Sequence, residues 1–241
     1  MTTITEHLQH VHDRILVACQ HAGREPASVR LLAVSKTFGV DAVLEAVAAG
    51  QRAFGENYIT EGVEKIAALR SWQALHADHN SAASPLEWHC IGPVQSNKTR
   101  LVAEHFDWVQ SVDRLKIAQR LSDQRPVHLP PLQVCLQVNI DGGANKSGVA
   151  PSEVLDLAKE VSRLPRLVLR GLMSIPETAI GFEALKALHT PALALFNLVN
   201  GSGVLPQPMD TLSMGMTADL EAAIDAGSTM VRVGSAIFGQ R

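Results

Sequence analysis

The sequence has 241 residues, of which 46% are hydrophobic and 19% are charged, and these values are typical of an ordinary globular protein. Its net charge of -3 argues against a nucleic-acid-binding surface, because such surfaces carry clustered positive charge. No apolar run is long enough for a membrane-spanning helix, and the first residues lack the apolar core of a signal peptide.

The sequence contains three cysteines, Cys19, Cys90 and Cys135, and no Cys-x-x-Cys pair. Disulfides persist in oxidising compartments and are rare in the cytosol. An odd number of cysteines without such a pair predicts buried free thiols in a reducing compartment. The expected location is therefore the cytoplasm.

The chain begins with a predicted amphipathic helix over residues 4–22 and then alternates between short apolar runs and helical segments. The predicted strands cover residues 30–35, 52–54, 88–91, 108–110, 132–140, 167–172, 211–213 and 230–233. The predicted helices cover residues 40–49, 58–69, 96–104, 113–121, 151–164 and 216–226, together with a long helix that ends at residue 199.

Three details of these elements are less regular. Asp113 is expected to cap the helix that follows it. Pro191 is expected to kink or break the long helix. Residues 71–86 fit a helix extension that runs into an exposed loop.

Eight strands that alternate with helices predict a parallel sheet. In this length the sheet closes most simply as a (β/α)8 or TIM barrel, and no composition break divides residues 1–241 into more than one domain. An open doubly wound sheet is the alternative. The few residues after the last strand are too short for a covering helix, so the extra N-terminal helix is expected to cover that position.

Barrel proteins bind their ligands at the C-terminal ends of the strands, and here these ends are rich in Gly, Ser, Asn and Lys. Phosphate groups are usually held by the loops after the seventh and eighth strands. Ser213-Met214-Gly215 and Gly234-Ser235 fall in those two places. Either motif alone is typical of a turn, but the two together favour an anion site.

Lys36 follows the first predicted strand directly, and in a closed barrel that strand lies beside the eighth. A lysine there is either a surface charge whose stem packs on apolar residues or a partly desolvated nucleophile. An amine beside a phosphate site is what pyridoxal 5′-phosphate requires, because its aldehyde forms a Schiff base with an amine. Arg232, near the second loop, is either a phosphate clamp or a salt-bridge partner.

Other polar residues give weaker signals. Asn57 and Lys146 are within reach of the surroundings of such a cofactor, although a lysine in DGGANKSG is more often a solvated loop charge. His89, Cys90 and Cys135 lie within predicted strands and are expected in the core. No metal-binding motif accompanies the histidines.

Seven segments, in this order, resemble those of the pyridoxal phosphate homeostasis protein family: LLAVSKT, FGENY, WHCIGPVQSNK, NKSG, LRGLMSIPE, LSMGMTADLEAAI and VRVGSAIFG. The resemblance runs nearly from end to end. It implies a monomeric fold-type III barrel like the N-terminal domain of alanine racemase, without the second β-domain of that enzyme. It also implies pyridoxal 5′-phosphate as the cofactor.

By this resemblance Lys36 forms the Schiff base, Asn57 lies near the ring, and Arg232 faces the pyridine nitrogen. An arginine in that place keeps the nitrogen unprotonated and weakens the ring as an electron sink. The residues expected at the cofactor, including those at its phosphate, are Lys36, Asn57, Ser213, Met214, Gly215, Arg232, Gly234 and Ser235.

The function implied by the resemblance is intracellular homeostasis of pyridoxal 5′-phosphate, by buffering it and delivering it to dependent apoenzymes, without catalytic turnover. The alternative is an amino-acid racemase that uses Lys36 as a base. Racemases of this fold take a second acid–base group from a tyrosine of their other domain. This sequence has a single tyrosine, Tyr58, so His89 or Cys90 would have to take that role. An enzyme that forms a Schiff base with a sugar phosphate fits the full-length resemblance least well.

Overall fold

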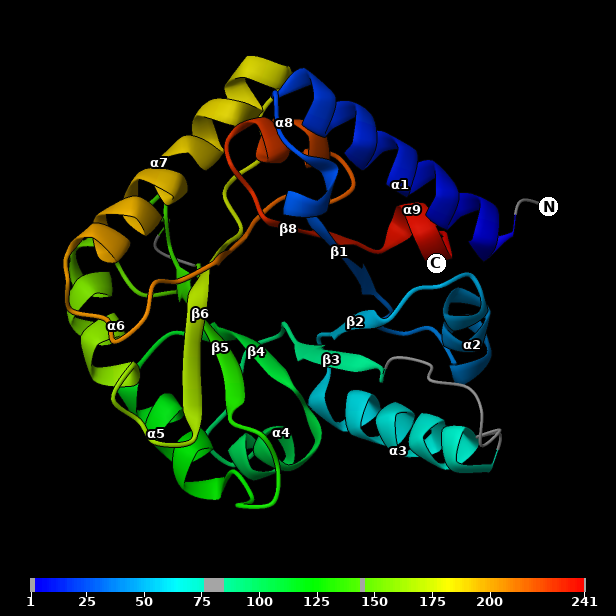
Figure 1. Ribbon diagram of the computed structural model, residues 1–241, viewed down its shortest axis with the longest axis horizontal. Helices are drawn as coiled ribbons and strands as arrows, with labels where there is room; N and C mark the ends of the chain where they lie inside the picture. Colours follow the sequence, from blue (N-terminus) through cyan, green and yellow to red (C-terminus); the bar gives the residue numbers. More distant parts are fainter. Residues whose placement is uncertain (1–2, 76–84, 144–145, 241) are drawn as a thin grey trace.

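The computed structural model describes residues 3–75, 85–143 and 146–240, and its centre is a closed barrel of eight strands. The strands pair in sequence order, every pair is parallel, and β1 (Arg30–Val34) closes the barrel against β8 (Met230–Val233). The helices surround the strands (Figure 1). The predicted (β/α)8 barrel is therefore confirmed, and the open sheet is excluded.

The other strands lie close to their predicted positions. Residues 211–213 and 230–233 form strands with the predicted bounds, whereas three strands continue further toward the mouth than predicted, to Glu56, Val112 and Ser174. The bounds are β2 (Ala53–Glu56), β3 (Glu87–Cys90), β4 (Trp108–Val112), β5 (Leu132–Val138), β6 (Leu167–Ser174) and β7 (Thr211–Ser213).

The helices alternate with these strands in the predicted order. Their bounds are α1 (Ile4–His21), α2 (Val40–Ala48), α3 (Ile59–Leu75), α4 (Thr99–His105), α5 (Leu115–Gln124), α6 (Val154–Val161), α7 (Phe182–Gly201), α8 (Leu220–Asp225) and α9 (Ser235–Phe238). Short 3-10 turns cover Pro26–Ser28 and Pro151–Glu153.

Three local predictions can be compared with these bounds. Asp113 does not cap α5, because its carboxylate pairs with Arg114 at 2.9 Å and no side chain caps that helix. Pro191 lies inside α7 and does not end it. The predicted extension after residue 69 is helical through Leu75, and residues 76–84 of the ambiguous segment lie outside the described residues.

The N-terminal helix α1 occupies the position that an eighth barrel helix would cover. It packs against α8, α9 and α2 (Figure 1). Arg14 holds both carboxylate oxygens of Glu221 at 2.7 and 2.9 Å, and His7 Nδ1 lies 2.9 Å from the carbonyl oxygen of Ile237. The predicted role of the extra helix is confirmed, since α9 after β8 is a helix of only four residues.

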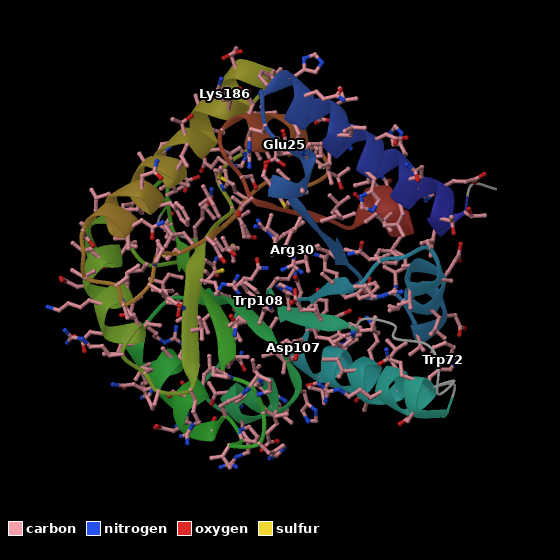
Figure 2. All side chains as sticks on the ribbon, in the orientation of Figure 1. Glu25, Arg30, Trp72, Asp107, Trp108 and Lys186 are labelled. Atoms are coloured by element: carbon pink, nitrogen blue, oxygen red, sulfur yellow. The ribbon has the colours of Figure 1, made fainter. Side chains whose placement is uncertain are left out.

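The core has two parts because side chains alternate between the two faces of each strand. Leu31 and Ala33 of β1 belong to the large cluster between the sheet and the helices, whereas Leu32 belongs to a small cluster with Ala53 and Met230. Arg30 and Trp108 lie within the ring of helices, and Trp72 lies at its periphery (Figure 2). In the described part of the chain, no helix is both long and apolar enough to cross a bilayer.

Candidate cofactor site at the barrel mouth

The C-terminal ends of the strands surround a cavity of about 580 Å³. Segments that follow β2, β3, β5 and β6 line it, and its polar lining residues include Asn57, Gln137, Lys146, Ser147, Glu177 and Thr178. This volume is within the range of small-molecule sites in proteins. Among the residues expected at the cofactor, Asn57 lines this cavity, and the others lie on the neighbouring side formed by β1, β7 and β8.

Lys36 lies one residue beyond the buried Ser35 at the end of β1 and is half-buried. Leu32 faces the barrel interior, and we expect Lys36, in the turn just after β1, to continue this alternation and lie on the same side. Leu32 is paired in register with Arg232 of β8. Lys36, expected at the aldehyde of the cofactor, and Arg232, expected at its ring nitrogen, therefore belong to neighbouring strands or their ends. Within the described residues, no group hydrogen-bonds or ion-pairs with the Lys36 amine.

Arg232 is buried inside the barrel, close to the mouth. Its guanidinium donates to Ser213 Oγ at 2.8 Å and to the carbonyl oxygen of Ser174 at 3.0 Å. Burial lowers the pKa of Arg232 to about 10, and no described carboxylate forms a salt bridge with it. The hydroxyl of Ser174 beside it is buried without a partner. A buried cation and an unpartnered hydroxyl fit a polar ligand at this point.

Ser213, which is expected at a phosphate, makes its contacts inside the barrel. Its hydroxyl donates to Gln110 Oε1 at 2.7 Å and accepts from Arg232, so its single proton is already committed inside the barrel. Sequence reasoning also missed Gln110, whose amide continues this contact to His89 Nδ1 at 2.9 Å. The period of a strand gives the face of a side chain but does not identify its partner on another strand.

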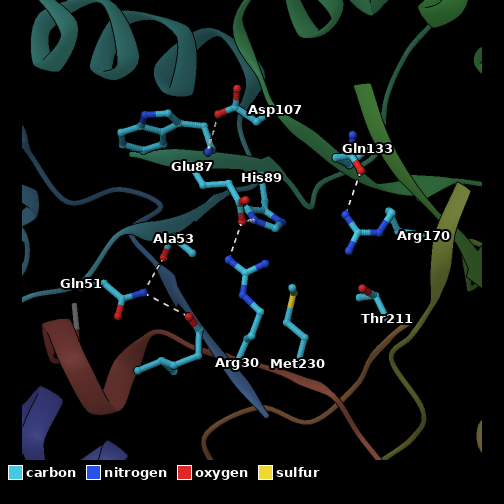
Figure 3. A network of polar contacts seen from close by, with 12 residues as sticks. Arg30, Gln51, Ala53, Glu87, His89, Asp107, Gln133, Arg170, Thr211 and Met230 are labelled. Atoms are coloured by element: carbon cyan, nitrogen blue, oxygen red, sulfur yellow. Dashed lines mark hydrogen bonds and ion pairs between the residues drawn. The ribbon is translucent and has the colours of Figure 1, made fainter. Parts of the chain in front are cut away.

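From His89 the hydrogen-bonded series continues to the opposite end of the barrel. His89 Nε2 lies 2.7 Å from Glu87 Oε1, and Arg30 donates to the same oxygen at 2.8 Å (Figure 3). His89 stacks on Trp108 with ring centroids 5.0 Å apart, and burial lowers the pKa of His89. The expectation that His89 is a core residue is therefore confirmed.

The loops after β7 and β8 meet, as expected for a shared anion site. The Ser235 hydroxyl donates to Thr217 Oγ1 at 3.3 Å, and Thr217 was not among the expected site residues. Gly215 has a φ of 92°, and a Cβ there would lie 2.5 Å from the Ala223 side chain. Only glycine therefore suits this turn.

Two other expected residues lie in this region. The Met214 side chain is fully buried, and its amide donates to the Met230 carbonyl at 3.1 Å, so Met214 serves the barrel itself. Gly234 precedes α9, and a Cβ there would lie 3.1 Å from the Val34 carbonyl oxygen. Gly234 thus allows the loop after β8 to pass close to the end of β1.

The cavity side of the mouth contains one residue that the sequence left as a loop charge. Lys146 lines the cavity and forms an ion pair with the carboxylate of Asp141, which also accepts from the Glu177 amide at 2.8 Å. Gly92 brings the loop after β3 against Asn57, since a Cβ at Gly92 would lie 2.0 Å from the Asn57 carbonyl oxygen. Both Lys146 and Asn57 therefore face the ligand side of the mouth.

A charged pair beside Lys36 was not expected from the sequence. Glu56, at the end of β2, accepts from Lys65 Nζ and from Ser35 Oγ, each at 2.6 Å. Burial raises the pKa of Glu56, although the charge of Lys65 and the hydrogen bonds from Lys65 and Ser35 act to lower it. The run AFGE is buried throughout, and an acidic residue at the end of such a run is the signal that was available. In the described part of the chain, no cluster of His, Cys, Asp or Glu is arranged to bind a metal.

The barrel and its mouth define the class of this protein. Residues 7–241 match the family described as the N-terminal domain of alanine racemase. The alanine racemase of Clostridium difficile, in complex with cycloserine, superposes with a TM-score of 0.69 at 15% identity, covering 95% of this chain and 59% of that chain. At this level of identity the likeness concerns the fold alone.

Relatives of higher identity give the family. A pyridoxal phosphate homeostasis protein of Vibrio cholerae is 54% identical over 241 residues, which cover 100% of this chain and 98% of that protein. PipY of Synechococcus elongatus, solved with pyridoxal phosphate bound, superposes with a TM-score of 0.80 at 32% identity, covering 98% of this chain and 100% of that chain. The chain therefore belongs to the pyridoxal phosphate homeostasis protein family.

Proposed function

We propose that this protein binds pyridoxal 5′-phosphate covalently through Lys36 and serves intracellular homeostasis of that cofactor, without turnover of a substrate. The observation that carries the proposal is the Lys36 amine just after β1, which has no partner among the described residues and whose strand pairs with β8, the strand of the buried Arg232. The names of its relatives and the ligand bound to PipY support the same cofactor.

The residues at the mouth fit this cofactor. When bound, it supplies an aldehyde that forms a C=N bond with an amine and releases water. Lys36 provides the amine. The Arg232 guanidinium has only hydrogen-bond donors, so it would favour an unprotonated ring nitrogen. The lone pair of that nitrogen would accept a hydrogen bond from the buried guanidinium. Asn57, which lines the cavity at the end of β2, would lie near the ring.

The phosphate belongs at the converging loops after β7 and β8. We expect the donors there to be the backbone N–H groups of Gly215, Gly234 and Ser235 and the hydroxyl of Thr217, which accepts from the Ser235 hydroxyl. Ser213 contributes indirectly, because its hydroxyl holds the Arg232 guanidinium. Its expected direct contact with phosphate is not part of the proposal.

Replacing the amine tests the proposal directly. Lys36→Ala should abolish the covalent adduct that borohydride reduction traps in the wild-type protein, while non-covalent binding through the phosphate loops partly survives. Mass spectrometry of the reduced protein and its absorbance near the visible edge measure both. Lys146→Ala is the matched control and should keep the adduct. An adduct that persists in Lys36→Ala would identify a different lysine.

The alternative function, amino-acid racemisation, needs an acid–base group across the substrate from Lys36. His89 has both ring nitrogens hydrogen-bonded inside the barrel, and burial raises the pKa of the Cys90 thiol to about 12. Neither is suited to proton transfer at the mouth. Tyr58 is 52% exposed and follows Asn57, so it is the remaining residue of the appropriate type.

A direct assay separates the two functions. Protein loaded with the cofactor should leave L-alanine unchanged in enantiomer, because neither His89 nor Cys90 is suited to proton transfer across the substrate from Lys36. Chiral chromatography after extended incubation measures this, with an alanine racemase as the positive control. Sustained formation of D-alanine that is lost in Tyr58→Phe would instead establish racemisation by Lys36 and Tyr58.

The proposal also includes that the chain forms one domain over residues 1–241, acts as a monomer in the cytoplasm, and transfers the cofactor to dependent apoenzymes. The single closed barrel supports the one domain. The three buried free cysteines support the cytoplasm, where thiols stay reduced. The reversible covalent bond supports transfer to apoenzymes, because water or another amine can release the aldehyde.

A further inference from the structure

Three charged side chains surround the backbone at Lys36, and we name them the strand-end clamp: Glu56, Glu61 and Lys65. Glu56 ends β2, and the other two residues lie on α3. Lys65 Nζ lies 2.6 Å from Glu56 Oε1 and 3.3 Å from Glu61 Oε1. The Lys65 and Glu56 side chains are 4% and 0% exposed, so the pair is buried.

The clamp binds the backbone on both sides of Lys36. Lys65 Nζ donates to the carbonyl oxygen of Ser35 at 2.8 Å, and the amide of Thr37 donates to Glu61 Oε1 at 2.5 Å. The two peptide groups that flank Lys36 are therefore both held by side chains of one helix. No contact of the clamp reaches the Lys36 amine, which has no partner in the part of the chain that the structure describes.

The backbone at Thr37 gives an independent reason to look for function here. Its φ of 66° is left-handed, and within the described residues it is the one non-glycine residue with a positive φ. A β-branched residue rarely adopts this conformation, and such strain persists only where its surroundings impose it. The hydrogen bond from Thr37 to Glu61 is one such constraint.

The side chains of this segment are sorted between the two faces of the barrel wall. Ser35 points toward α3, where its hydroxyl donates to Glu56 Oε1 at 2.6 Å. Fixing Ser35 on the outer side directs the next residue, Lys36, toward the interior. A buried ion pair is weak evidence for stability, but it can select one geometry over others.

We infer that Glu61 and Lys65 are positioning residues for Lys36, which hold the backbone of residues 35–37 so that the amine meets an aldehyde at the mouth. The inference rests on the proposed function. In the step concerned, the neutral Lys36 amine adds to the aldehyde carbon, a C=N bond forms, and the carbonyl oxygen leaves as water with the two hydrogens of the amine. The clamp changes neither reactant, and it raises the fraction of encounters with productive geometry.

The test uses Glu61, because its side chain is 34% exposed and its loss leaves the buried Glu56–Lys65 pair intact. Glu61→Ala should slow adduct formation with pyridoxal 5′-phosphate by roughly tenfold to a hundredfold. The affinity of this variant for pyridoxamine 5′-phosphate should stay at the wild-type value. That compound has the ring and the phosphate but no aldehyde. Stopped-flow absorbance and calorimetry measure the two quantities, and thermal unfolding confirms that the variant is folded.

Two further variants sharpen the result. Glu61→Gln retains an oxygen that accepts from Thr37 and should restore most of the rate. Glu64→Ala removes an exposed carboxylate from the same helix and should match the wild type. Wild-type rates in Glu61→Ala, or equal losses in Glu61→Ala and Glu64→Ala, would overturn the inference alone. A wild-type protein that forms no adduct would instead overturn the proposed function, and the inference with it.

Discussion

Buried polar residues inside the barrel form one hydrogen-bonded series that links the mouth to the opposite end. Arg232 contacts Ser213, which continues through Gln110 and His89 to Glu87. Each buried member is satisfied by its neighbours, so the loss of one leaves the next without a partner. At the scale of single residues, the orientation of Arg232 therefore depends on side chains deeper in the barrel.

The acidic end of this series predicts a pH dependence of stability. Burial alone would raise the pKa of Glu87, but the hydrogen bond and charge of His89 and the charge of Arg30 outweigh it and hold the pKa at about 2. The folded-state pKa lies below the reference value of 4.5, so this carboxylate stabilises the fold above that pH. Its contribution is lost as the pH falls from 4.5 toward about 2.

We therefore expect Glu87→Gln to flatten the acid-induced loss of unfolding free energy in that window. Urea denaturation at a series of pH values, followed by tryptophan fluorescence, measures the slope. Glu64→Gln, at an exposed position of α3, should leave the slope at the wild-type value. Equal slopes in the wild type and in Glu87→Gln would contradict the assignment.

At the scale of elements, α1 substitutes for a helix that the barrel would otherwise lack. One face of α1 is buried against α8, α9 and α2, and Leu8 on that face is 2% exposed. Leu16 of the same helix is 41% exposed. The helix thus offers a buried and an exposed leucine for comparison.

Removing the buried leucine should weaken the whole fold. Leu8→Ala is expected to lower the free energy of unfolding by about 2–5 kcal/mol, because a cavity replaces a packed side chain. Leu16→Ala should change it by less than about 0.5 kcal/mol, as is usual for surface substitutions. Chemical denaturation measures both. A similar cost for the two variants would mean that α1 is not packed as described.

At the scale of the whole molecule, hydrophobic periodicity was sufficient to predict the barrel. Residues 211–213 and 230–233 coincide with the predicted strands, since short β-rich runs between turns are local signals. The predicted cap of α5 was wrong because two groups, a side chain and the helix end, compete for the same carboxylate. Asp113 has the side chain of a good cap, yet Arg114 takes its carboxylate.

In the candidate site too, local signals were predicted and contacts between distant elements were not. The ends of β1, β7 and β8 placed Lys36, Gly215 and Ser235 at the mouth, because parallel strands bring their C-terminal ends together. The inward contact of Ser213 and the buried Glu56–Lys65 pair were not predicted. Both depend on packing between elements far apart in the sequence, which period and spacing do not encode.

The docking of α1 also constrains the order in which the protein can be completed during synthesis. Arg14 pairs with Glu221, 207 residues further along the chain, and His7 contacts Ile237, 230 residues away. The residues of α1 are synthesised long before these partners, so the part of its apolar face that packs on α8 and α9 stays uncovered through most of translation. The docking of α1 on α8 and α9 is therefore expected among the last folding events.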